Sequence, residues 1–160
     1  MENKEIERNE LKIGDKAPDF SFVDSKNMET KLSSYRGRNV VVYFYPKDFT
    51  PGCTIEAEEF SKDYEKFREK NITVIGISPD DDKSHEKFKI KMNIPYELAS
   101  DRGNEISKKY GVYGMKTFMG KKYMGINRTT FLIDEKGFIK KIFNKVKPKG
   151  HGQDVLTEFA

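Results

Sequence analysis

At 160 residues the chain has the length of one domain, and we expect residues 1–160 to form a single unit with residues 1–10 as a flexible or helical lead-in. No run approaches the roughly 18 apolar residues of a membrane span, and the charged start of the chain does not resemble a signal peptide. A single cysteine excludes a secreted disulfide scaffold and favours a reducing compartment. We therefore expect a cytoplasmic protein with no membrane partner.

The net charge of +4 arises from 30 basic and 26 acidic residues that are spread along the chain. Residues 136–149 form one local excess of lysines without any acidic residue. Such a stretch could bind nucleic acid, but the sequence contains no recognisable nucleic-acid-binding module. A solvated strand face followed by a loop is the simpler interpretation, so no nucleic-acid partner is expected.

The first part of the chain predicts short elements. Residues 11–20 contain glycine and proline and are typical of a turn followed by extended chain. Residues 20–23 and 30–32 are predicted to pair as a small hairpin. A short helical turn is expected over residues 33–37, where a glycine ends it.

Two apolar segments and the helix between them predict the centre of the fold. Residues 40–45 are β-branched or aromatic and predict a buried strand, and residues 71–78 predict a second one. Between them, apolar residues recur at spacings of three and four and predict a helix over residues 54–70. A strand, helix and strand in this order indicate a parallel βαβ unit with a right-handed crossover.

The second half of the chain continues to alternate helices and strands. The predicted elements are a helix over 83–91, a strand over 96–99, a short helix over 104–110, strands over 129–133 and 138–143, and a final helix over 154–159. Together the elements predict an α/β fold with a central mixed sheet of four or five strands flanked by helices. This order fits a thioredoxin-like sandwich.

The only cysteine stands where the first apolar strand gives way to the helix. Pro46 ends the strand, and counting back four residues from Ala57 places Cys53 in the first helical turn, on the face toward the core. Unpaired N–H groups and the positive end of the helix dipole favour an anion there, and the thiolate is the nucleophilic form of cysteine. The alternative is a buried structural cysteine, which the pattern alone leaves open.

The residues around Cys53 resemble a known active-site signature. Pro46, Thr50 and Cys53 have the spacing of the peroxiredoxin motif, and residues 45–54 resemble the bacterioferritin-comigratory, or PrxQ-like, branch of that family. Further segments follow in the family's order at residues 14–20, 35–37, 74–78 and 119–134. The resemblance covers residues 11–159. It implies a thiol-dependent peroxidase of antioxidant defence, which reduces hydrogen peroxide and small organic hydroperoxides without a cofactor.

The resemblance also implies a role for each of five residues. Cys53 would be the peroxidatic nucleophile that becomes a sulfenic acid, and the Thr50 hydroxyl would bond to the peroxide and the thiolate. Arg128 would keep the thiolate ionised and polarise the O–O bond. Pro46 would shield the sulfur from water, and Glu56 would orient the arginine.

Taken one at a time, these residues also have ordinary structural explanations. Thr50 could only start the helix, and Glu56 could be a carboxylate that the first helical turn favours. Arg128 could be a surface charge at the start of a strand. Their occurrence together with Cys53 favours the catalytic interpretation.

The two histidines carry a different expectation. His85 and His151 are far apart in the sequence and lack the spacing of metal ligands, so we expect both on the surface. No metal site is predicted.

One position departs from the pattern of the branch. Many members carry a second, resolving cysteine five residues after the first, but here that position is Glu58. The resemblance therefore implies a one-cysteine peroxiredoxin, whose sulfenic acid is reduced by an external thiol such as a thioredoxin-like protein or a small thiol. A redox sensor that turns over slowly is the alternative that the missing cysteine favours. The chain could be a monomer or a dimer.

Overall fold

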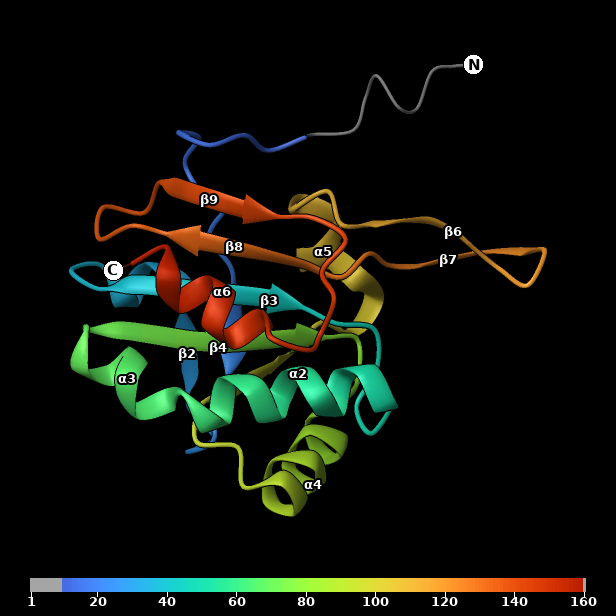
Figure 1. Ribbon diagram of the computed structural model, residues 1–160, viewed down its shortest axis with the longest axis horizontal. Coiled ribbons are helices and arrows are strands. Elements are labelled where there is room, and N and C mark those ends of the chain that lie inside the picture. The colour runs from blue at the N-terminus through green and yellow to red at the C-terminus, as the bar shows by residue number, and fades with distance from the viewer. Residues whose placement is uncertain (1–9, 160) are drawn as a thin grey trace.

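A mixed five-stranded sheet forms the centre of the computed structural model, which describes residues 10–159 (Figure 1). The strand order is β5-β4-β3-β8-β9, with parallel pairing from β5 to β3 and antiparallel pairing from β3 to β9. The α/β, thioredoxin-like fold class predicted from the sequence is confirmed. The strands are β3 (Asn39–Phe44), β4 (Ile72–Ser78), β5 (Glu97–Ser100), β8 (Thr129–Ile133) and β9 (Ile139–Phe143).

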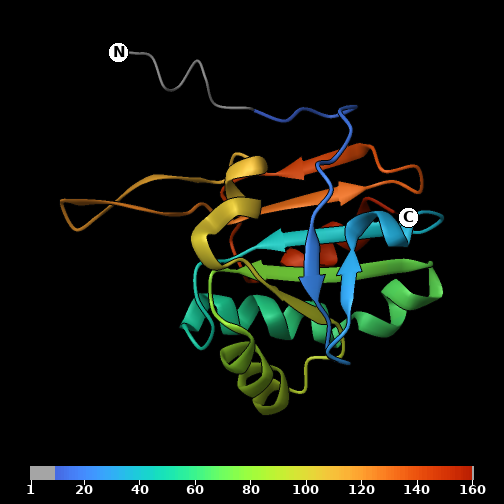
Figure 2. The same ribbon diagram turned by 180° about the vertical axis from the view of Figure 1, so that it is seen from behind.

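Helices cover one face of the sheet, and a hairpin with short helices covers the other. In Figure 1, α2 (Pro51–Lys62), α3 (Tyr64–Glu69) and α6 (His151–Thr157) lie in front of the sheet, and α4 (Asp82–Met92) lies beyond its β5 edge. Within residues 10–159, every helix is too short or too polar to cross a membrane. Seen from behind in Figure 2, the opposite face carries β1 (Ser21–Val23), β2 (Glu29–Lys31), η1 (Leu32–Tyr35), η2 (Arg102–Asn104) and α5 (Glu105–Lys109).

The alternation of side chains along β3 divides the core into two layers. Val40, Val42 and Phe44 pack on the side of the β1–β2 hairpin. Val41 and Tyr43 point the other way and pack under the helices, in the same cluster as Cys53. Because side chains of a strand alternate between faces, the run of β-branched and aromatic residues after Asn39 in β3 is explained by burial on both faces.

The predicted helix over residues 54–70 is two helices in the structure. It begins three residues earlier, at Pro51, and it is broken at Asp63, whose backbone (φ −95°, ψ 9°) separates α2 from α3. Proline is well tolerated in the first turn of a helix, and short acidic side chains favour helix ends over helix interiors. The final helix also begins earlier than predicted, at His151. Residues 1–9 of the expected lead-in lie outside the described residues.

One hairpin was missed by the sequence reasoning. Strands β6 (Tyr113–Phe118) and β7 (Lys121–Ile126) pair antiparallel and project away from the sheet (Figures 1 and 2). Their turn has positive φ at both Met119 and Gly120, which is the geometry of a tight type I′ turn. Most of the hairpin's side chains are at least partly exposed, so no apolar face produces the alternation that reveals a strand. The first turn position is occupied by Met119 instead of the asparagine, aspartate or glycine typical of such turns, so the sequence does not indicate a turn here.

The expectation for the histidines was wrong. His85 is 4% exposed and His151 is 3% exposed, so neither lies on the surface. Each ring instead satisfies a buried hydrogen bond, His85 with Asp48 and His151 with the Thr130 hydroxyl. The partners lie 37 and 21 residues away in the sequence, so a local sequence pattern could not predict these hydrogen bonds.

Candidate active site

Cys53 lies in the first turn of α2, directly beyond the carboxyl end of the central strand β3. The Tyr45 N–H still donates to Ile77 O (3.0 Å), but Pro46 has no N–H, so the ladder ends there. Thr50 is extended, Pro51 opens the helix, and Cys53 follows with only 1% of its surface exposed. The structure therefore places the thiol where the N–H groups of a helix start favour an anion.

Arg128 is the charged partner of the thiol. Its Nη2 donates to Cys53 Sγ at 3.4 Å, and its Nη1 donates to Glu56 Oε1 at 2.6 Å. The arginine directly precedes β8, whose first residue, Thr129, pairs with Phe44 at the end of β3. This antiparallel register carries the guanidinium to the start of α2. A Cβ at Gly52 would lie 3.1 Å from Nη2, so glycine gives the arginine room to approach.

Glu56 is a fully buried carboxylate one turn after Cys53. Burial raises the pKa of Glu56 to about 7, although the Arg128 guanidinium opposes the shift. For Arg128, burial disfavours the charge, but the carboxylate of Glu56 and the sulfur of Cys53 outweigh burial and raise its pKa. The guanidinium therefore stays charged beside the sulfur. Among residues 10–159, Glu56 Oε2 has no hydrogen-bond partner, and Arg128 is the one residue of this range that bonds the carboxylate.

Thr50 and Pro46 lie in the turn that leads to Cys53, and both are half-buried. Thr50 occupies the cap position of α2, yet its side chain does not cap the helix. Its hydroxyl donates instead to Lys47 O at 2.8 Å, while its carbonyl accepts from the Thr54 N–H. The structure thus brings Cys53, Arg128 and Glu56 into direct contact, whereas Thr50 and Pro46 are neighbours of the thiol along the chain without a hydrogen bond to it.

Comparison with known proteins adds the family. The AhpC/TSA family model matches residues 13–142. The chain belongs to this family. It is 48% identical over 147 residues to a putative peroxiredoxin bcp of Buchnera aphidicola, which covers 92% of this chain and 93% of the relative. It is 44% identical over 146 residues to peroxiredoxin Bcp of Bacillus subtilis, covering 91% and 93%.

Solved structures agree with this assignment. The Xanthomonas campestris bacterioferritin comigratory protein superposes with a TM-score of 0.82 at 34% identity, covering 88% of this chain and 89% of that one. Xylella fastidiosa PrxQ superposes with a TM-score of 0.87 at 34% identity, covering 94% and 96%. This chain is thus a peroxiredoxin of the bacterioferritin-comigratory branch, and Cys53 is its only cysteine.

Two features of this peroxiredoxin were not visible in the sequence. Lys116, on the missed hairpin, is half-buried and donates to Ile126 O at 2.7 Å. Burial lowers the pKa of Lys116, and the charge of Arg128 lowers it further against the effect of Cys53, so the lysine belongs to the electrostatic surroundings of the thiol. Glu58, at the position of the usual resolving cysteine, is exposed, whereas Cys53 faces the core.

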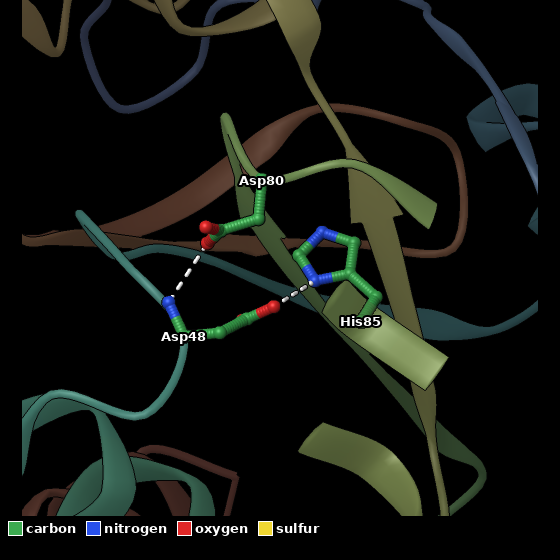
Figure 3. A group of neighbouring side chains, drawn as sticks. All are labelled: Asp48, Asp80 and His85. Carbon is green, nitrogen blue, oxygen red and sulfur yellow. Dashed lines mark hydrogen bonds and ion pairs between the residues drawn. The ribbon is translucent and has the colours of Figure 1, made fainter. Parts of the chain in front are cut away.

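A second polar cluster lies beside the active-site turn. Asp48, Asp80 and His85 each offer a possible metal-ligand atom, and these atoms lie within 4.8 Å of one another (Figure 3). However, Asp48 Oδ2 is bonded to His85 Nδ1 at 2.8 Å, and Asp80 Oδ2 accepts from the Asp48 N–H at 2.8 Å. The three residues satisfy one another by hydrogen bonds, so we interpret them as an internal network.

Proposed function

We propose that this peroxiredoxin reduces hydrogen peroxide and small organic hydroperoxides with Cys53 as the nucleophile. The observation that supports this most is the contact of a charged guanidinium with a sulfur at a helix start, Arg128 Nη2 to Cys53 Sγ at 3.4 Å. Two independent sources of positive potential therefore converge on the thiol. A structural cysteine in a packed core needs neither of them.

The proposed reaction begins with the thiolate of Cys53 attacking one oxygen of the peroxide. A sulfur–oxygen bond forms, the O–O bond breaks, and the departing oxygen leaves with the electron pair and takes up a proton to become water or an alcohol. Arg128 stabilises the thiolate before the attack and the negative charge on the departing oxygen during it. Glu56 holds Arg128 in place, and the Thr50 hydroxyl supplies a further hydrogen bond to the peroxide. Pro46 limits the access of water.

An external thiol is proposed to complete the cycle. It attacks the sulfenic acid of Cys53, which releases water and forms a mixed disulfide, and a second thiol then releases Cys53 as a free thiol. An internal disulfide is not available, because the chain has one cysteine. The single free thiol also favours a cytoplasmic setting, and we propose that the chain acts there as one catalytic domain.

The test is the reaction of reduced protein with one equivalent of hydrogen peroxide, followed by intact mass and a sulfenic-acid trapping reagent. We expect rapid stoichiometric trapping at Cys53 and none in Cys53→Ser. Thr50→Val should slow the reaction by about 100-fold if its hydroxyl bonds to the reacting oxygen. Thr54→Val, in the same turn, is the matched control and should react like the wild type. A wild-type thiol that stays unreactive for minutes would refute the proposal.

Turnover with a dithiol separates the peroxidase from the redox sensor that the missing resolving cysteine favours. Continuous consumption of peroxide at a rate set by the dithiol concentration supports the peroxidase. A sulfenic acid that persists in excess dithiol, together with a protein captured only by the oxidised form, would instead support the sensor.

A further inference from the structure

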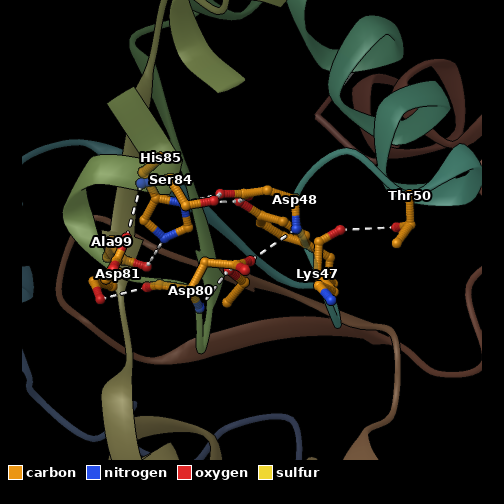
Figure 4. A network of polar contacts seen from close by, with 11 residues as sticks. Lys47, Asp48, Thr50, Asp80, Asp81, Ser84, His85 and Ala99 are labelled. Carbon is orange, nitrogen blue, oxygen red and sulfur yellow. Dashed lines mark hydrogen bonds and ion pairs between the residues drawn. The ribbon is translucent and has the colours of Figure 1, made fainter. Parts of the chain in front are cut away.

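Asp48 lies two residues before Thr50 and is an unusual aspartate for a loop, because it is 3% exposed and both of its carboxylate oxygens are bonded. Oδ1 accepts from the Tyr45 hydroxyl at 2.6 Å. Oδ2 contacts the Ser84 hydroxyl and His85 Nδ1, each at 2.8 Å (Figure 4). A buried carboxylate with this number of donors is stabilised as an anion. Asp48 therefore ties the loop after β3 to the first turn of α4.

His85 is held between two acceptors. Its Nε2 lies 3.1 Å from Ala99 O in β5, and a carbonyl oxygen can only accept, so Nε2 carries a proton. Its Nδ1 faces the Asp48 carboxylate, which can only accept when it is ionised. With Asp48 ionised, both ring nitrogens act as donors, and His85 and Asp48 form an ion pair at 2.8 Å. The pair joins three elements: the loop, α4 and the edge strand β5.

The main chain of the same loop is held at two more points. The Asp48 N–H donates to Asp80 Oδ2, and that oxygen also accepts from the Ser78 hydroxyl at 2.6 Å. Phe49 has a φ of +68°, a left-handed conformation that is unfavourable for a bulky residue. Its ring packs against Phe88 of α4 with centroids 5.0 Å apart. Such a conformation persists where the surroundings fix it, and Asp48 is the residue just before it.

We propose that the Asp48–His85 pair is a positioning device for the active-site turn. By fixing residues 47–49 against α4, it sets the place of Lys47 O, to which the Thr50 hydroxyl donates, and thereby the direction of that hydroxyl toward the reacting peroxide. Neither Asp48 nor His85 is in hydrogen-bond contact with the thiol, so both act through Thr50. The inference rests on the proposed role of Cys53 and adds the element that keeps its turn in a reactive geometry.

The first test is a spectroscopic signature of the wild-type protein. The ¹⁵N chemical shifts of the His85 ring, assigned by their loss in His85→Asn, should show both nitrogens protonated near pH 7. A ring with one unprotonated nitrogen would overturn the ion pair. This measurement does not depend on the activity of Cys53.

The second test compares two buried histidines. His85→Asn should lower the second-order rate constant for Cys53 oxidation by roughly 10- to 100-fold, the cost of a displacement of about 1 Å in a reactive arrangement. His151→Asn removes a histidine that is equally buried but is bonded to Thr130 rather than to Asp48. It should lower the melting temperature while the rate constant stays within about twofold of the wild type.

A milder variant keeps the proposal testable if His85→Asn does not fold. Ser84→Ala removes one hydroxyl donor to Asp48 and should reduce the rate constant in the same direction, by a smaller factor. Equal rate constants for the wild type and every folded network variant would overturn the positioning role. That outcome would leave the proposed function intact, provided that the wild type is fast and Cys53→Ser is inert. A slow wild type would instead refute the proposed function.

Discussion

Replacing Arg128 by methionine should separate the two roles of the guanidinium. In the wild type, one side of the group bonds Glu56 and the other bonds Cys53. Methionine keeps much of the apolar stem but leaves the fully buried Glu56 carboxylate without a partner in the described part of the chain, where its Oε2 already has none. Breaking a buried ion pair in this way costs about 3–5 kcal/mol of unfolding free energy.

The double variant Arg128→Met with Glu56→Met should recover most of that stability. Both charges are then removed together, and replacing a whole buried ion pair by hydrophobic residues of similar volume is often close to neutral. The reactivity of Cys53 should not recover, because the hydrogen bond to the sulfur is still missing. A bond to a charged group contributes about 1.5–3 kcal/mol, so we expect a rate constant roughly 10- to 100-fold below the wild type in both variants.

Urea unfolding curves and stopped-flow oxidation by hydrogen peroxide give the two quantities on the same protein samples. Glu56→Gln alone is the control, because its amide oxygen can still accept from Arg128 Nη1 and the guanidinium stays beside the sulfur. A double variant that regained the wild-type rate together with its stability would refute the reasoning. It would show that Arg128 affects Cys53 only through folding.

Three further changes give distinct outcomes. The pKa of Glu56 is about 7 in the folded protein and about 4.5 in the unfolded chain, so the folded state binds more protons between these pH values. The wild type therefore loses stability as the pH rises from 4.5 to 7. Over that range Glu56→Gln should gain about 3 kcal/mol of unfolding free energy relative to the wild type. Burial lowers the pKa of His151 to about 4, so the unfolded chain binds more protons between pH 4 and 6.5 and the wild type gains stability as the pH rises. Over that range His151→Asn should lose about 3 kcal/mol of unfolding free energy relative to the wild type. Urea unfolding at a series of pH values checks both, and parallel profiles would contradict them. Gly52→Ala should push Arg128 away from the sulfur and slow Cys53 oxidation roughly tenfold, with little change in melting temperature.

The sequence was sufficient for the sheet and for the setting of Cys53. Strands β3 and β4 consist mostly of apolar residues, and the helical segment between them has a clear period, so local pattern and chain order together specify a parallel pair. The thiol's place in the first turn of α2 follows from counting along one short segment. The β6–β7 hairpin could not be found in this way, because its exposed side chains carry no alternation.

The contacts of Arg128 with Glu56 and Cys53 depend on the tertiary structure. Arg128 reaches Glu56 across 72 residues of sequence and Cys53 across 75, and only the β3–β8 register brings them together. The resemblance to known peroxiredoxins had named these residues, but their contacts are not a property of any local pattern. The resemblance did not point to Asp48 or His85. Buried polar side chains are hydrogen-bonded, and the tertiary structure decides which residue is the partner. His85, expected on the surface from the sequence, is buried and bonded to Asp48 in the loop before Cys53.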